Sequence, residues 1–562
     1  MMQHQAQAAR DLIEALVAGG VCDAVISPGS RNTPLVLAAQ ACAKLRCSVA
    51  IDERVAGFIA LGMSRMSGRP PLLICTSGSA LAHYLPALLE ADEARVPIIV
   101  LSAARPDEMT DCGAPQALDQ GHILDPALRW FKQLPLADEQ GAKAWAPAAV
   151  GALAACWGSP EGPVHLNCPF REPLWAEGLE TQARRGASLV PSVPSVDLNA
   201  LDGLARRLSE KRGWLVCGPM HGSAAHDERL LDAVRAFAQS LGWPVFAEPA
   251  SRLRGRCGAN EAGYLDRLLG AGFVGPYEPE VVVQIGSGLT SKRVRQWLSS
   301  WSGDHLILDR DGLWRDPTLG AGLLVAGDEA GTLDRLSKQQ LVAAPSDWLT
   351  TWRDAAQAAE SSLDVEGWSE ASALGRVIEH FDCMQVASSL PIRHLEGWIP
   401  RSKMPTTVLS NRGLNGIDGT LSTALGVATS SGQKTLVVIG DVAFVHDLGA
   451  LAQIVAEQPD LAVLVIDNSG GGIFRRLPIA AHPSAFESCF ETPPAIDLLS
   501  AARGLGLSAE RVEDHDALSQ VVPVWVRASG PRVLIADVGH DQDQDWRALV
   551  DQALIGLLGG RG

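Results

Sequence analysis

The chain has 562 residues, of which 47% are hydrophobic and 20% are charged, a composition typical of a globular protein with an ample core and not of a disordered chain. At about 100–200 residues per domain, this length predicts about three domains. The net charge of −17 argues against a nucleic-acid partner and against attraction to an anionic membrane.

The cysteines and the N-terminus give expectations about location. Eleven cysteines are scattered without a C-x-x-C pair or a zinc-like spacing, which indicates reduced thiols and a cytoplasmic protein. Residues 1–20 predict an amphipathic helix that ends at Gly19-Gly20 and not a signal peptide. No apolar run approaches the ~20 residues needed to cross a bilayer, so we expect no membrane span.

The first third of the chain alternates predicted strands with predicted helices, and each strand ends in a polar or glycine-containing turn. This rhythm is typical of a doubly wound parallel sheet. We predict an N-terminal domain over residues 1–180, with a helix from Glu53 to about Met66. Its strands are expected at residues 22–27, 48–52, 71–76 and 97–102, with a last one at 162–169.

The middle third predicts a second α/β domain over residues 195–345. Its strands are expected at residues 213–218, 244–247, 281–286 and 305–309, and patternless linkers at 172–198 and 343–371. Residues 284–288 (QIGSG) invite a dinucleotide-binding interpretation. The full G-x-G-x-x-G pattern is absent because position 291 is Ser, so a packing turn is the better interpretation.

The last third, residues 370–562, contains the most informative stretch. Two apolar runs, 436–439 and 461–466, bracket a helical segment, which predicts a βαβ unit with parallel strands. Asp441 and Asn468 then follow neighbouring strand ends, where ligands collect in such sheets. A carboxylate, an amide oxygen and a carbonyl from the glycine-rich turn 469–472 would suit Mg²⁺, which takes its remaining ligands from phosphate and water. This predicts a metal-bridged diphosphate site, although an ordinary strand-end Asp remains the alternative.

Charged residues at other strand ends suggest further chemistry. Glu53 could be a carboxyl with a raised pKa in an apolar setting, or a helix N-terminal Glu favoured by the dipole; its position alone does not decide. Guanidinium groups bind carboxylates in bidentate fashion, so basic residues at turns suggest a polyanionic small substrate. Surface ion pairing would explain any single one of them. The set is Arg31, Arg393, Arg412 and the pair Lys292-Arg293.

The spacing of Asp441 and Asn468 resembles the thiamine-diphosphate motif, with Val442 where the family usually has Gly and Ser469 where it usually has a second Asn. Longer phrases make the resemblance specific. SPGSRNTP, DERVAGFIALG, DCGAPQALDQ, TSKRVRQW, SSLPIRHLE, SNRGLNGIDG and DNSGGGIFRRLP together resemble the family of 2-succinyl-5-enolpyruvyl-6-hydroxy-3-cyclohexene-1-carboxylate (SEPHCHC) synthases. The match runs nearly end to end, in the family's order.

The resemblance implies an α/β fold with three doubly wound parallel-sheet domains: pyrimidine-binding, central, and diphosphate-binding. It implies thiamine diphosphate with Mg²⁺, or Mn²⁺ in its place, held by Asp441, Asn468 and Gly470. Other cofactor-contacting positions implied are Glu53, Gln116, Ser388, Ser389, Gly416 and Ile417. Substrate-contacting positions implied are Ser30, Arg31, Gln116, Lys292, Arg293, Ser389, Arg393, Arg412, Ile473, Phe474 and Leu477. Of these, Glu53, Ser389, Arg393 and Arg412 are the expected catalytic group.

The implied reaction is decarboxylation of 2-oxoglutarate and addition of the resulting succinyl carbanion equivalent to isochorismate, in menaquinone or phylloquinone biosynthesis. The implied enzyme is a homodimer or homotetramer in which Glu53 of one chain reaches the cofactor held by another. Alternatives remain another thiamine-dependent 2-oxoacid decarboxylase or acetolactate-synthase-like carboligase, a non-catalytic cofactor-binding relative, and a nucleotide-binding oxidoreductase.

Overall fold

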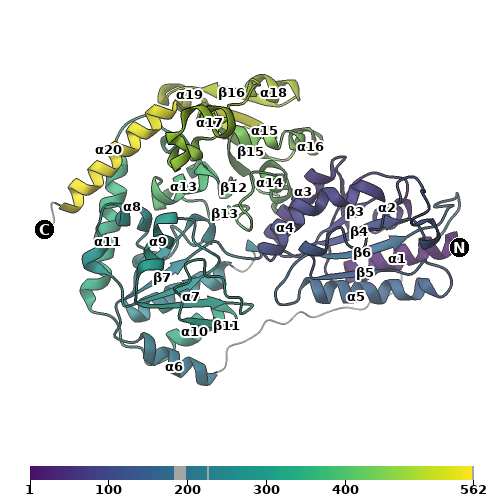
Figure 1. The fold of residues 1–562 in the computed structure, drawn as a ribbon, viewed down its shortest axis with the longest axis horizontal. Coiled ribbons are helices and arrows are strands. Elements are labelled where there is room, and N and C mark those ends of the chain that lie inside the picture. The colour runs from purple at the N-terminus through teal and green to yellow at the C-terminus, as the bar shows by residue number, and fades with distance from the viewer. Residues whose placement is uncertain (183–197, 225–226, 560–562) are drawn as a thin grey trace.

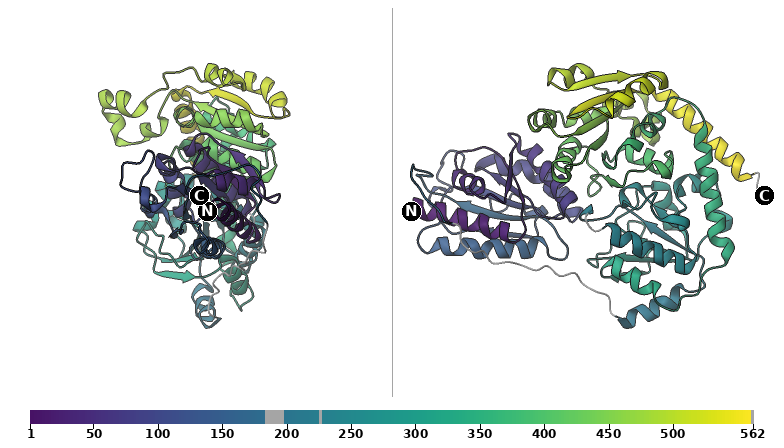
Figure 2. Two further views of the ribbon diagram at one scale, coloured as in Figure 1. Left: turned by 90° about the vertical axis from the view of Figure 1, so that its right-hand side faces the viewer. Right: turned by 180° about the vertical axis from the view of Figure 1, so that it is seen from behind.

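The computed structural model describes residues 1–182, 198–224 and 227–559. Three parallel sheets, each covered by helices, follow one another along the chain (Figure 1). The two termini lie at opposite ends of the long axis (Figures 1 and 2). The predicted α/β class is confirmed, while the predicted domain limits stay predictions.

The N-terminal sheet has the strand order β2-β1-β3-β4-β6-β5. The strand predicted at 48–52 ends early, at Val49, because Asp52 instead caps helix α3 by accepting a hydrogen bond from the Arg54 N–H at 2.9 Å. Strand β5 was not predicted; it lies at the sheet edge, and its residues are half-buried or exposed. The strands are β1 Asp23–Ile26, β2 Arg46–Val49, β3 Leu72–Cys75, β4 Ile99–Ala104, β5 Trp130–Gln133 and β6 Val164–Pro169. The helices are α1 Met2–Ala18, α2 Thr33–Gln40, α3 Glu53–Ser67, α4 Leu85–Glu93 and α5 Trp145–Cys156.

The central sheet has the order β11-β10-β9-β7-β8. The predicted linker at 343–371 is wrong for most of its length, because helix α11 occupies it and buries Trp348 and Trp352 in the central core. Part of the other predicted linker, residues 183–197, lies outside the described residues. The strands are β7 Gly213–Cys217, β8 Val245–Ala247, β9 Val281–Ile285, β10 Asp304–Asp309 and β11 Leu323–Ala326. The helices are α6 Leu198–Leu208, α7 Asp227–Leu241, α8 Leu265–Gly270, α9 Lys292–Ser300, α10 Glu329–Ser337 and α11 Ser346–Ser361.

The turn after β9 packs closely against another backbone segment. Gly286 has φ +79°, and a Cβ atom there would lie 2.7 Å from the Gly218 carbonyl oxygen. Ser287 donates its N–H to the Pro219 carbonyl at 2.8 Å. The glycine therefore permits close packing of two turns, as the packing-turn interpretation predicted.

The C-terminal sheet has the order β13-β12-β14-β15-β17-β16, which repeats the order of the N-terminal sheet when the strands are renumbered from β12. The predicted parallel neighbours β14 and β15 are confirmed, with Gly440 opposite Ile466. The strands are β12 Cys383–Val386, β13 Thr407–Leu409, β14 Thr435–Gly440, β15 Leu461–Asp467, β16 Ser508–Val512 and β17 Arg532–Asp537. The helices are α12 Glu370–Gly375, α13 Leu390–Gly397, α14 Thr420–Ser431, α15 Asp441–His446, α16 Gly449–Glu457, α17 Pro483–Phe486, α18 Leu498–Gly504, α19 His515–Trp525 and α20 His540–Gly559.

The first and last sheets are joined through helices α3 and α14, which lie side by side (Figures 1 and 2). The approach is close: a Cβ atom at Gly62 would lie 2.0 Å from the Thr423 carbonyl oxygen, and one at Gly426 would lie 2.0 Å from that of Ile59. Buried side chains of both domains form one apolar cluster. No helix among the described residues is long and apolar enough to cross a membrane.

Candidate functional site

Asp441 lies at the C-terminal end of β14, under the glycine-rich turn that follows β15. It is buried, and its two carboxylate oxygens accept hydrogen bonds from the backbone N–H groups of Val442, at 2.8 Å, and Gly470, at 2.6 Å. The turn uses Ser469 and Gly470 with positive φ of 62° and 127°. A side chain at Gly470 would meet the Glu491 carbonyl oxygen at 2.2 Å, so this position requires Gly.

Asn468 lies in the same turn and presents an oxygen that fits a metal ion. Its Nδ2 donates to Glu370 Oε1 at 2.9 Å. Its Oδ1 is buried without a hydrogen-bond partner among the described residues. A buried amide oxygen left without a partner is costly, and a hard cation such as Mg²⁺ prefers oxygen ligands of this kind. The donor set of Asp441 and Asn468 therefore fits the expected metal.

Two buried acids at this turn, Asp441 and Glu370, have pKa values shifted in opposite directions. Burial raises the pKa of Asp441 to about 7, and the nearby Asp467 adds to the effect. A cation is what would hold such a carboxyl ionised. Burial alone would also raise the pKa of Glu370, but His394 and the hydrogen bond from Asn468 outweigh it and lower that pKa to about 2.

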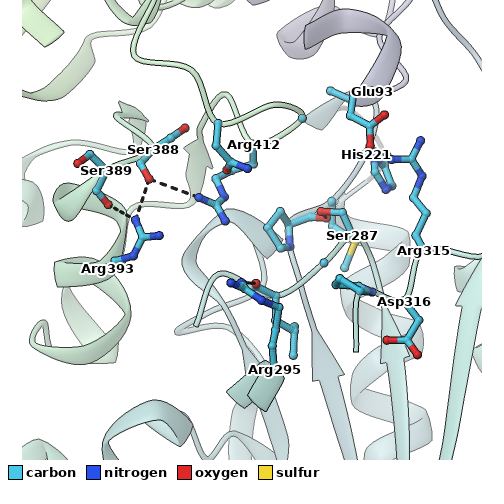
Figure 3. A pocket seen from close by; sticks show the side chains of 18 of the residues that line it. Glu93, His221, Ser287, Arg295, Arg315, Asp316, Ser388, Ser389, Arg393 and Arg412 are labelled. Carbon is cyan, nitrogen blue, oxygen red and sulfur yellow. Dashed lines mark hydrogen bonds and ion pairs between the residues drawn. The ribbon is translucent and has the colours of Figure 1, made fainter. Parts of the chain in front are cut away.

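A cavity of about 1080 Å³ opens where the three domains meet, next to the turn (Figure 3). The N-terminus of helix α13 faces it, and this end of a helix favours anions. Arg393 donates to the carbonyls of Ser388, at 3.0 Å, and Ser389, and Arg412 donates to Ser388 at 3.4 Å. Of the predicted site residues, the cavity is lined by Ser388, Ser389, Arg393, Arg412, Ile417, Ile473 and Phe474.

Three arginines of this cavity, Arg295, Arg393 and Arg412, have no carboxylate within ion-pair distance among the described residues. Arg295 joins Arg393 and Arg412 there and donates to the carbonyls of Leu289 and Thr290. Burial lowers the pKa of Arg393 and of Arg412, and each also lies near a second arginine. Guanidinium groups bonded only to neutral carbonyls keep their positive charge available for a bound anion.

A second cavity, of about 600 Å³, shares Arg295, Arg393 and Ile473 with the first. Lys292, Arg293 and Leu477 line it. Ser291 caps helix α9, so Lys292 and Arg293 begin that helix. Arg293 is engaged with Asp266 Oδ2 at 2.8 Å. The two cavities together bring most of the predicted substrate-contacting residues to one region.

The loop that carries Arg412 and Ile417 is anchored by the N-terminal domain. The backbone N–H groups of Gly413 and Leu414 donate to the two carboxylate oxygens of Glu90 at 2.8 and 2.6 Å, and Arg65 donates to the Ser410 carbonyl. Gly416 lies in this loop, and Ile417 keeps 40% of its surface exposed. Glu90 is buried in helix α4.

The predicted site residues of the N-terminal domain do not line either cavity. Glu53 begins helix α3, whose opposite end carries Arg65 at the first cavity; at 1.5 Å per residue the two are about 18 Å apart. Ser30 is exposed, Gln116 donates to the Ser77 carbonyl at 2.9 Å, and Arg31 pairs with Glu172 at 2.8 Å. Within one chain these four residues are separate from the arginine cavity.

Several residues at the site were not predicted. Arg295, Glu90 and Glu370 come from elements whose contacts with the site arise only in the folded chain. Arg315, which pairs with Glu93, and the half-buried His221 line the first cavity from the central domain (Figure 3). Arg295 had a sequence signal, since it stands one helical turn after the predicted Lys292. Nothing in the sequence around Glu90 or Glu370 distinguishes either residue from the other glutamates of the chain.

Three family models of thiamine-dependent enzymes match successive parts of the chain. They are the N-terminal TPP binding domain at residues 6–123, the middle domain at 200–384 and the C-terminal TPP binding domain at 395–536. Here TPP is thiamine pyrophosphate, the same compound as thiamine diphosphate.

Curated relatives agree with the family models. SEPHCHC synthases of Myxococcus xanthus and Geobacillus kaustophilus are 36% and 38% identical. The matches cover 92% of this chain and 91% of the first relative, and 88% of this chain and 88% of the second. That of Halorubrum lacusprofundi is 34% identical, over 90% of this chain and 88% of its own length. The chain therefore belongs to the SEPHCHC synthase family of thiamine-diphosphate-dependent enzymes.

Proposed function

We propose that this chain decarboxylates 2-oxoglutarate and adds the succinyl carbanion equivalent to isochorismate, in menaquinone or phylloquinone biosynthesis. The observation that carries the proposal is the cluster of Arg295, Arg393 and Arg412 beside the proposed metal-binding turn, residues 468–472. Both substrates are dicarboxylates, and unpaired guanidinium groups are matched to carboxylates.

The residues of the C-terminal domain would hold the cofactor. Thiamine diphosphate supplies the electron sink for loss of carbon dioxide. Asp441, Asn468 and the Gly470 carbonyl would hold Mg²⁺ or Mn²⁺ at the diphosphate, and the α13 N-terminus at Ser388-Ser389 would face that anion. Gly416, Ile417 and Gln116 are the further predicted cofactor contacts.

Substrate binding and positioning would fall to the basic residues and the apolar wall. Arg393, Arg412 and Ser389 lie close enough to share one carboxylate-bearing substrate, while Lys292 and Arg293 border the adjoining cavity. Ile473, Phe474 and Leu477 supply apolar surface that excludes water. The protein would then act mainly by orientation and charge complementarity.

The active site would be completed by a second copy of the chain, in a homodimer or a homotetramer. Four predicted site residues do not line the arginine cavity of their own chain, so they would act at the cavity of a partner chain. They are Glu53, Ser30, Arg31 and Gln116. Exposed apolar side chains around these residues indicate a surface that a partner chain covers; Ile51, two positions before Glu53, is 80% exposed.

We also propose a cytoplasmic location, because the eleven cysteines are free.

The test is product identification from purified protein. With thiamine diphosphate, Mg²⁺, 2-oxoglutarate and isochorismate, we expect SEPHCHC, with one carbon dioxide released per product. Omitting the cofactor or the metal should abolish it. An acetolactate-synthase-like carboligase or a simple 2-oxoacid decarboxylase would instead turn over without isochorismate and leave it unchanged, which would contradict the proposal.

A further inference from the structure

Behind the metal-binding turn lies a buried carboxylate that contacts one of the expected ligands. Glu370 is the first residue of helix α12, after the N-cap Ser369, and only 1% of it is exposed. Its Oε1 accepts the hydrogen bond from Asn468 Nδ2 at 2.9 Å. This contact joins the start of α12 to a turn 98 residues later in the sequence.

The contact decides which way the Asn468 amide faces. An ionised carboxylate can only accept hydrogen bonds, so the NH₂ group must be the end that faces Glu370. Oδ1 must then point away from Glu370, and it is the atom left buried without a partner. With the amide reversed, two oxygens would face each other, and the ligand position would hold an NH₂ group.

Glu370 is itself fixed from two sides. Its other oxygen, Oε2, accepts from His394 Nε2 at 2.8 Å, and His394 is 1% exposed on helix α13. The backbone N–H of Glu370 donates to Asp543 Oδ1 at 3.2 Å. The carboxylate therefore cannot swing away from Asn468 without breaking buried contacts.

We propose that Glu370 is a positioning residue for the metal: it fixes the Asn468 amide so that Oδ1 faces the cation, and His394 fixes Glu370. Partners that orient a metal ligand in this way typically contribute 10–100-fold to metal affinity. The inference rests on the metal site of the proposed function, but not on the identity of the two substrates.

The same cluster could be mistaken for a second metal site. Ligand atoms of Glu370, His394 and Asp543 lie within 4.8 Å of one another. Both oxygens of Glu370 are already used, however, and Asp543 Oδ2 lies 2.8 Å from an Arg547 guanidinium nitrogen. These contacts make the cluster a network of buried charges and not a set of free ligands.

The experiment is titration of Mn²⁺ into the purified protein with thiamine diphosphate, followed by electron paramagnetic resonance of free Mn²⁺. Glu370→Ala should weaken Mn²⁺ binding about 10–100-fold. Glu370→Asp, which retracts the carboxylate by one methylene, should weaken it by at least about fivefold. Glu370→Gln has a single oxygen that can accept from Asn468 or from His394 but not from both, so its Mn²⁺ affinity should lie between those of wild type and Glu370→Ala. At saturating Mn²⁺ the kcat of each variant should return to within about threefold of wild type, because only the population of loaded sites is reduced.

Asp543→Asn is the matched control, since it changes a buried acid of the same cluster that does not touch Asn468; its Mn²⁺ affinity should stay within about twofold of wild type. Unchanged affinity in Glu370→Asp, with Glu370→Ala either unchanged or unfolded, would overturn the proposal. So would a second Mn²⁺ per wild-type chain that Asp543→Asn removes. Wild-type protein that binds Mn²⁺ tightly but makes no SEPHCHC would refute the proposed function and leave this inference standing.

Discussion

Arg393 is the single side chain from which we expect the clearest effect on substrate binding, because it borders both cavities and donates only to backbone carbonyls. A hydrogen bond to a charged group contributes about 1.5–3 kcal/mol, so Arg393→Ala should raise the KM of at least one substrate about 10–100-fold. The thiamine diphosphate affinity should not change. Arg393→Lys keeps the charge but loses the planar guanidinium group, so its KM should lie between those of wild type and Arg393→Ala. Steady-state kinetics with each substrate varied would check this, and an unchanged KM for both would contradict it.

Glu53 should affect turnover and not metal binding. Its expected role is a hydrogen bond between its carboxyl and the cofactor's aminopyrimidine ring, and a positioned acid–base group typically contributes about 10²–10⁴-fold to rate. Glu53→Gln should therefore slow product formation by at least about 100-fold while the Mg²⁺ requirement stays near normal. Asp52→Asn, at the adjacent helix cap, is a control for damage to helix α3. Wild-type turnover in Glu53→Gln would remove this residue from the mechanism.

At the scale of elements, the loop from Ser410 to Gly419 depends on helix α4 of another domain. Glu90→Gln would place an NH₂ group against one of the two backbone donors of Gly413 and Leu414. An unpaired buried donor costs about 1–3 kcal/mol, so the loop should become more mobile. The KM of the substrate that Arg412 binds should then rise about 3–10-fold. Amide hydrogen exchange at residues 413 and 414 should accelerate in parallel. Asp92 lies on the same helix as Glu90 and pairs with Arg129, which is outside that helix. Asp92→Asn weakens this pair without touching the loop, so it should leave both the KM and the amide exchange unchanged.

The elements also show what sequence patterns can and cannot predict. Strands β14 and β15 were predictable because their apolar, β-branched runs are fully buried strands of a parallel sheet, and Asp441 and Asn468 follow directly from their ends. Strand β5 escaped prediction because an edge strand with half its residues exposed lacks such a run. Helix α11 escaped because its buried face is made largely of Ala and Trp, which do not stand out as a strong apolar repeat. Glu90 and Glu370 could not be predicted, because each becomes functional through a contact with a residue about 100 or more positions away.

For the whole molecule, the repeated strand order of the first and last sheets places two similar domains against each other through α3 and α14. That contact buries the Arg65 end of α3 at the cavity, whereas the Glu53 end lies at the other end of the helix and does not line the cavity. A chain by itself therefore holds both halves of the predicted site, but not joined to each other. In a symmetric dimer each half would meet its complement on the partner, and two equivalent sites would result.

Mixing two inactive variants tests this arrangement directly. Glu53→Gln removes one half of the site, and Asp441→Asn removes the other. If each site takes Glu53 from one chain and Asp441 from the other, a mixed dimer has one site with both substitutions and one site with neither. Random reassembly makes about half of the dimers mixed, so about a quarter of the wild-type activity should return. Unfolding and refolding each variant alone is the control and should restore nothing. If the site lay within one chain, the mixture would stay as inactive as its parts, and the shared site would have to be abandoned.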